Sequence, residues 1–394
     1  MEQQNILNPT SAIALILLIS FSFVLVGFFY SKKFKGLNNY LVADGSVGTF
    51  SLTCSLVASA LGTWILFGPA SAATWGGIGA VIGYSLGTAF PLFAIIFIGK
   101  IFRNSYPNAK TLIEVIRLRF GKHIFKLILI LSIFYMTIFL IAEVTAVSIL
   151  INYISGTKLW ITALIVISSS LLYTLYGGLR ASIFTDNIQF IVFTLLLLIA
   201  FSYLFAFNTN EFSFEFINKN KPNLLSKNYI PNFTAGLTFF IAVAATNLFH
   251  QGNWQRVYAA KNNDVLKKSL LFSFLIIIPI VYMMGFTGLV SVSKNLNVTP
   301  DLAFFSLLLN KEIPTLSIIV IVLGISLTIS SIDTLINAIS SLIIVDGKKI
   351  LSSNKDYLKL SRNIIIGLSF IALYIASKGF SILYLFLLAD LFCC

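Results

Sequence analysis

Long apolar runs recur along almost the whole chain, and short polar or basic segments separate them. Stretches such as residues 12–30, 128–141 and 190–207 are too apolar for ordinary core helices. Because a helix needs roughly 20 apolar residues to cross a bilayer, the pattern predicts an all-α polytopic membrane protein. The expected spans lie near residues 11–30, 46–72, 76–101, 123–153, 159–179, 182–207, 233–255, 265–291, 314–345, 360–377 and 380–394.

One of these expected helices carries a polar stripe at mid-depth. Within residues 324–342, the side chains of Ser326, Ser330, Asp333 and Asn337 recur at i, i+4, i+7 and i+11 and so share one face. A carboxylate and an amide are costly in lipid unless they face protein or a water-filled path. The stripe therefore predicts a polar partner on a neighbouring helix.

Composition supports a membrane protein and explains the charge. The chain is 58% hydrophobic and 10% charged, whereas about a quarter of a soluble domain is charged. The net charge of +13 comes from Lys and Arg concentrated in alternate loops, as the positive-inside rule describes. We expect an integral plasma (inner) membrane protein with its N-terminus outside and its C-terminus inside, and no nucleic-acid partner. The cysteines Cys54, Cys393 and Cys394 show no metal-ligand spacing and are interpreted as packing residues.

The second and seventh expected spans look interrupted. Residues 55–75 mix small residues with a Gly-Pro pair, which fits either close helix packing or an unwound segment whose carbonyls coordinate a cation. The seventh span ends with Asn247, His250 and Gln251 before Gly252, a candidate break point, and a basic cluster at 256–268 marks the inner face.

Two interrupted helices five spans apart predict an inverted repeat, because odd spacing places the two blocks in opposite orientation. We expect a single domain over residues 1–394. Within it, 11–30 is an extra first helix, 46–207 is the first repeat, and 233–394 is a second, incomplete repeat.

Few titratable side chains lie within the spans. Glu143 stands alone among apolar residues, which favours a helix-packing hydrogen bonder over a catalytic base. Asp186 begins the sixth span, where a carboxylate suits the positive end of the helix dipole. His250 is interpreted as a structural histidine, since His123, near the inner surface, is the only other one. No metal cluster, nucleophile elbow or phosphate loop occurs, so an enzyme is not expected.

Four stretches resemble the sodium:solute symporter family, which includes sodium/proline, sodium/sugar and urea/polyamine transporters. The stretches are GGLRASIFTDNIQ (177–189), WQRVYAAK (254–261), SSIDTLINAIS (330–340) and YLVADGSVG (40–48). The resemblance implies a leucine-transporter-like 5+5 inverted repeat and sodium-coupled uptake by alternating access.

It also implies a sodium site of backbone carbonyls and hydroxyls, neutral oxygens that suit an ion which must be released. The matching positions are Ala58, Leu61, Leu327, Ser330 and Ser331. The resemblance further gives Asp186 a role in the ion path. Candidates for solute binding beside the sodium are Thr63, Trp64, Asn247 and Gln251, although Trp64 also fits lipid-facing packing.

Two departures from the family pattern bear on function. The arginine that follows YLVA-type segments is replaced around Asp44, which leaves open any inner-gate contact. The last span has fifteen residues, 380–394, fewer than a crossing needs, so we expect a truncated or minimal last helix.

The leading prediction is a secondary active transporter that couples sodium to a small organic solute such as an amino acid or urea. The alternatives are a non-transporting sensor or truncated paralogue of the same fold, and a proton-coupled symporter that uses Glu143, Asp186 or Asp333. The solute and the oligomeric state stay open.

Overall fold

The computed structural model describes residues 6–207, 209–296, 299–350 and 356–391, and this part of the chain is almost entirely helical. Cys393 and Cys394 lie outside the described residues, and Cys54 is buried. The helices are α1 (Pro9–Ser31), α2 (Leu37–Val42), α3 (Thr49–Ala60), α4 (Gly68–Ser105), α5 (Leu112–Ser155), α6 (Leu159–Phe207), α7 (Phe214–Asn220), α8 (Ile230–Phe249), α9 (Gln251–Ala259), α10 (Asn263–Ser293), α11 (Ala303–Leu308), α12 (Pro314–Ser341), α13 (Tyr357–Ala376) and α14 (Ile382–Leu391). Eight described helices are long and apolar enough to cross a membrane.

Glycines with positive φ bend the three longest helices where the sequence predicts boundaries. Gly77 in α4, Gly121 in α5 and Gly178 in α6 have φ values of 59°, 81° and 59°. Glycine takes this backbone conformation without the steric cost that a Cβ brings. Gly77 therefore separates the second predicted span from the third, and Gly178 separates the fifth from the sixth.

The second and seventh spans are both broken. In the second, α3 ends at Ala60, a 3₁₀ turn covers Thr63–Leu66, and α4 begins at Gly68. In the seventh, His250 is extended at ψ 111° between α8 and α9. Backbone hydrogen bonds from Val47 to Ala259 and from Lys261 to Val47 join the start of one broken span to the end of the other. For the second span, the structure thus selects the unwound alternative over simple close packing.

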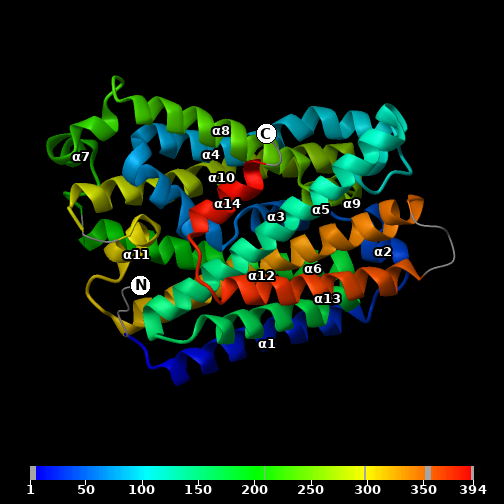
Figure 1. Cartoon of the computed structure of the whole chain (residues 1–394), viewed down its shortest axis with the longest axis horizontal. Coiled ribbons are helices and arrows are strands. Elements are labelled where there is room, and N and C mark those ends of the chain that lie inside the picture. The colour runs from blue at the N-terminus through cyan, green and yellow to red at the C-terminus, as the bar shows by residue number, and fades with distance from the viewer. Residues whose placement is uncertain (1–5, 208, 297–298, 351–355, 392–394) are drawn as a thin grey trace.

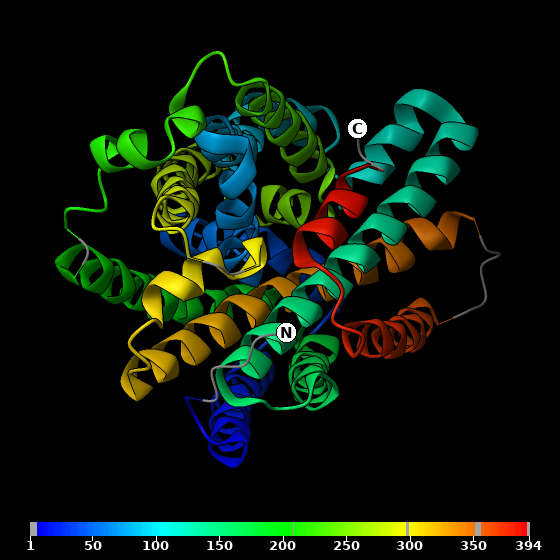
Figure 2. The same cartoon turned by 60° about the vertical axis from the view of Figure 1, so that its left-hand side comes forward.

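The helices form two groups with α12 and α5 between them (Figures 1 and 2). Helices α4, α8 and α10 pack together on one side, and α1, α6 and α13 pack on the other. Helix α12 is the most buried of the eight candidate spans. Large apolar side chains such as Leu18 and Phe21 on α1 are exposed, as expected for a lipid-facing helix.

Helices α4 and α8 approach closely through small residues. A Cβ on Gly83 would overlap the backbone carbonyl of Gly236, and one on Gly87 would lie 2.7 Å from the carbonyl oxygen of Phe239. Van der Waals packing at such small-residue contacts is a main source of helix association in lipid. This contact holds α8, which leads into the break at His250, against α4.

Gly83→Val should lower the melting temperature of the purified protein by roughly 5 °C or more, because overpacking against backbone costs about 1–3 kcal/mol or more. Gly367→Val is the matched control, since a Cβ at this exposed position on α13 meets nothing within 4 Å. Equal melting temperatures for the two variants, measured by thermal unfolding in detergent, would contradict the α4–α8 contact.

Candidate functional site

The carbonyls of Ala58 and Leu61 lie at the broken end of α3. The Leu61 N–H donates to Val57 at 2.9 Å, and Leu61 itself leaves helical geometry with φ −102° and ψ 86°. The helical donor for Ala58 would be the N–H of Gly62, and this bond is not formed. Among the described residues, no hydrogen bond reaches the Leu61 carbonyl either. Both residues are buried, so these two carbonyl oxygens are available to a cation.

Helix α12 brings hydroxyls to the same place. Leu327, Ser330 and Ser331 are buried on α12, and the Ser331 hydroxyl has no hydrogen-bond partner in the described structure. A Cβ on Gly62 would lie 2.6 Å from Oγ of Ser331, which shows how closely this hydroxyl approaches the break. The Ser330 hydroxyl instead donates to Oδ1 of Asp186 at 2.7 Å, and the lone pairs of the Ser330 oxygen remain available to a cation.

Asp186 and Arg256 form a fully buried ion pair next to these oxygens. Nη2 of Arg256 lies 2.9 Å from Oδ2 of Asp186, and both side chains are inaccessible to solvent. Ser55 on α3 donates to the same carboxylate at 2.5 Å and accepts from Nε of Arg256 at 2.7 Å. Arg256 also bonds to Thr334 at 2.9 Å and to the Gly252 carbonyl at 3.1 Å. The pair therefore joins α3, α6, α9 and α12.

Two interpretations from the sequence are wrong here. Asp186 lies two turns beyond the bend at Gly178 and bonds to side chains, so it does not cap a helix. Arg256 does not mark the inner surface, because its side chain is fully buried. Sequence reasoning also missed Ser55 as a partner of both. The sequence did contain a signal for the ion pair: the arginine of the WQR stretch, Arg256, and a carboxylate at a mid-membrane position, Asp186. A buried guanidinium requires an acid as its partner.

The polar partners of Asp333 lie on α6. Tyr173 donates to its carboxylate at 2.5 Å and Ser182 donates at 2.8 Å. With Ser330 bonded to Asp186, two members of the α12 stripe face α6, as the stripe predicts. The other two differ: the Ser326 hydroxyl and the Asn337 amide have no partner among the described residues.

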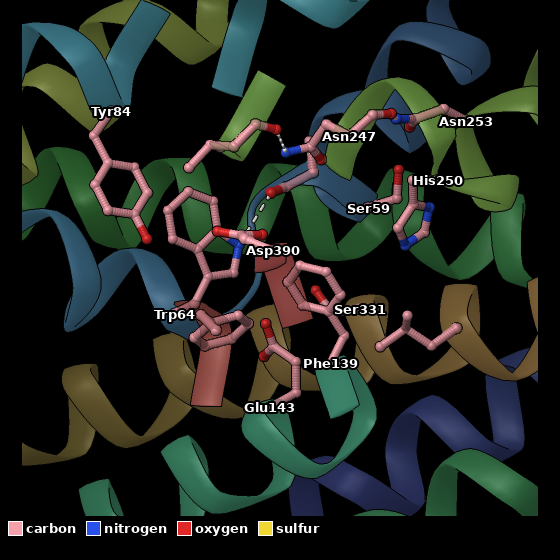
Figure 3. A pocket seen from close by; sticks show the side chains of 14 residues that line it. Ser59, Trp64, Tyr84, Phe139, Glu143, Asn247, His250, Asn253, Ser331 and Asp390 are labelled. Atoms are coloured by element: carbon pink, nitrogen blue, oxygen red, sulfur yellow. Dashed lines mark hydrogen bonds between the residues drawn. The ribbon is translucent and has the colours of Figure 1, made fainter. Parts of the chain in front are cut away.

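A cavity lies beside the two breaks (Figure 3). Trp64 and Asn247, two of the predicted solute-binding residues, line it together with Glu143, Ser331 and others. It offers about 50 Å³ to water-sized molecules, which is room for a few waters at roughly 10–15 Å³ each. A larger solute therefore requires side chains around the cavity to move.

The other two predicted solute-binding residues are bonded elsewhere. The Thr63 hydroxyl donates to the Gly324 carbonyl at 3.0 Å and contacts Thr328, so it holds the 3₁₀ turn against α12. Gln251 accepts from the Leu112 N–H at 3.0 Å and does not line the cavity. Their roles in solute binding remain predictions that these contacts do not support.

Glu143 and His250 each stabilise one break. Oε2 of Glu143 accepts from the Thr63 N–H at 2.9 Å, a donor that the interrupted helix leaves free. Nδ1 of His250 accepts from the Gly252 N–H at 3.1 Å and so caps α9. Both contacts agree with the structural interpretations of these residues.

The model of the sodium:solute symporter family matches residues 40–389 of this chain. The spermidine transporter DUR31 of Candida albicans is 26% identical over 381 residues, which cover 95% of this chain and 71% of that protein. Sodium/glucose cotransporter 1 of Mus musculus is 30% identical over 52% of this chain and 31% of its own length. Sodium/myo-inositol cotransporter 2 of Bos taurus is 30% identical over 48% of this chain and 29% of its own. The last two alignments thus span about a third of those relatives.

Among solved structures, a Na⁺-coupled sialic acid symporter in a substrate-bound outward-open state superposes with a TM-score of 0.74. It is 18% identical, and the superposition covers 93% of this chain and 81% of that one. At this identity the similarity shows the fold, and it confirms the predicted leucine-transporter-like architecture.

Asp186→Asn should destabilise the protein by about 3–5 kcal/mol, because it leaves the Arg256 guanidinium buried and uncompensated. The double variant Asp186→Asn/Arg256→Met should recover much of this loss. Glu211→Gln is the control, since its ion pair with Lys294 is partly exposed and such pairs contribute at most about 1 kcal/mol. Thermal unfolding in detergent measures all three; a double variant no more stable than the single one would contradict the pairing.

Proposed function

Since the chain belongs to the sodium:solute symporter family, we propose that it is a secondary active transporter that couples sodium entry to uptake of a small organic solute. The observation that carries this proposal is the meeting of free carbonyls at Ala58 and Leu61 with the unpartnered Ser331 hydroxyl. Sodium is a hard cation that prefers oxygen ligands, so these atoms form a suitable site. Leu327 and Ser330 complete the proposed set.

The proposed sodium and solute sites share one segment. The carbonyl oxygens of Ala58 and Leu61, which belong to the proposed sodium site, lie on one side of the break after Ala60. Trp64, which lines the cavity, lies on the other side. Nε1 of Trp64 donates to the Ala60 carbonyl at 3.2 Å, so the ring is attached to the end of α3. Sodium bound at Ala58 and Leu61 orders this end and thereby fixes Trp64 for the solute, which couples the two binding events.

Asp186 is proposed to act on the ion path through Ser330. Its carboxylate fixes the Ser330 hydroxyl, and its charge is balanced by Arg256, so the pair adds little net charge to the sodium site. Such weak ligation favours release of the ion on the far side of the membrane.

The proposed location is the plasma (inner) membrane, with the N-terminus outside and the C-terminus inside. Support comes from the Lys and Arg residues of the loops after α1 and α4 and before α13, which lie on the same side by the order of the spans. The solute and sodium are the expected partners.

Uptake into proteoliposomes tests the proposed function. An inward sodium gradient should drive accumulation of solute, and a potassium gradient at the same pH should not. Equal uptake in sodium and potassium, together with a dependence on a pH gradient, would show that the coupling ion is the proton and not sodium. No accumulation of any solute under either gradient would contradict transport.

Ser331→Ala should raise the sodium concentration for half-maximal uptake about tenfold or more, because it removes one ligand oxygen from a cation. Its melting temperature should change little, since the hydroxyl makes no hydrogen bond in the described structure. Ser326→Ala is the matched control: it is another buried, unpartnered hydroxyl on α12, outside the proposed site. The assignment fails if both variants keep the wild-type sodium dependence.

A further inference from the structure

Two buried carboxylates face the cavity from different helices. Glu143 on α5 and Asp390 on α14 are 2% and 5% exposed, and both line the cavity (Figure 3). Glu143 accepts the Thr63 N–H, and the Thr246 hydroxyl, which donates to the Ala242 carbonyl, lies beside Asp390. In the part of the chain that the structure describes, neither carboxylate has a Lys, Arg or His within salt-bridge distance. An unpaired buried carboxylate is costly, and either a proton or a positive charge in the cavity offsets this cost.

Aromatic rings line the same cavity in a continuous series. Trp64 stacks on Tyr84 with centroids 5.4 Å apart, and it lies 6.3 Å from Phe386. Phe386 lies 5.3 Å from Phe139, which contacts His250 at 6.4 Å. All five rings line the cavity. Aromatic faces attract ammonium groups within about 6 Å, most strongly where water is excluded.

Helix α14 contributes both kinds of contact. Phe386 and Asp390 are four residues apart on this helix and so share one face. The nearby guanidinium of Arg256 is already engaged by Asp186, Ser55 and Thr334 and does not neutralise this pair. His250 uses Nδ1 to cap α9.

We propose that this cavity binds the solute as an organic cation, an alkylamine or polyamine, through Asp390 and Glu143 and the rings of Trp64, Phe139 and Phe386. This inference rests on the proposed function and specifies its solute class. With a neutral polyol in this desolvated site both carboxyls must hold a proton, whereas an ammonium group offsets their negative charge and contacts the ring faces.

The relatives leave this choice open, because their names cover both classes: spermidine is a polyamine, and glucose and myo-inositol are neutral polyols. The cavity of this chain favours the first class. Of the two acids, Asp390 is the better residue to replace in a test of solute binding. Oε1 of Glu143 also lies at the break at Gly62 beside Ser331, so a change at Glu143 would disturb the proposed sodium site as well.

Competition experiments on the wild-type protein test the solute class without any variant. Putrescine is the labelled probe, with sodium-driven uptake into proteoliposomes and a thermal shift in detergent as two readouts. Unlabelled spermidine and choline should compete, and glucose, myo-inositol and urea at equal concentration should not. Sodium-driven uptake confined to neutral solutes would overturn the cation site and leave the proposed symport intact. A putrescine thermal shift without sodium-driven uptake of any solute would support the site and reject symport.

Asp390→Asn should weaken putrescine binding and uptake about tenfold or more, since it removes the charge from a charge-assisted contact. The concentration of sodium for half-maximal uptake should change less than about twofold. Glu215→Gln is the control, because this carboxylate is exposed on α7, away from the cavity. An Asp390→Asn variant that folds and keeps the wild-type affinity for putrescine would overturn the assignment.

Discussion

The buried pair between Asp186 and Arg256 is the constraint on which the rest of the site depends. It lies where the half-helix α3, the long helix α6, the half-helix α9 and the central helix α12 meet. A charge in the middle of a membrane protein must be paired, and this pairing fixes the relative positions of four elements. The opposite charges of the two residues also offset each other, so the pair adds little net charge to the carbonyl and hydroxyl oxygens beside it.

Neutral oxygens at interrupted helices suit a transported ion. The break at Leu61 frees carbonyls that an intact helix would use internally, and Glu143 satisfies the N–H of Thr63 on the other side of the break. The Thr63 N–H is therefore satisfied although it is buried where the cavity begins. Two further carboxylates, Glu143 and Asp390, line the cavity, and Oε1 of Glu143 also reaches the break at Gly62 beside Ser331.

Sequence patterns predicted the features that depend on local chemistry. Hydropathy located the spans, and glycines at 77 and 178 produced the expected turns. The polar stripe on α12 indicated a polar partner, because a carboxylate at mid-membrane depth is costly unless another polar group meets it.

What sequence alone could not supply is the pairing of distant residues. Arg256 looked like an inner-surface residue, since counting positive charges does not reveal an acid 70 residues earlier in the chain. Asp390 was missed because it lies in a short apolar helix whose neighbours are set by packing. Thr63 and Gln251 had suitable chemistry near the breaks, but the direction of each side chain is decided by tertiary contacts.

The central claim is that neutral oxygens at the break in the second span, held beside the Asp186–Arg256 pair, bind sodium. Equilibrium binding of ²²Na⁺ to the purified wild-type protein in detergent, without solute, tests it most directly. The account predicts saturable binding that unlabelled sodium displaces and potassium at the same concentration does not. Binding that shows no saturable component, or that potassium displaces equally well, would contradict it.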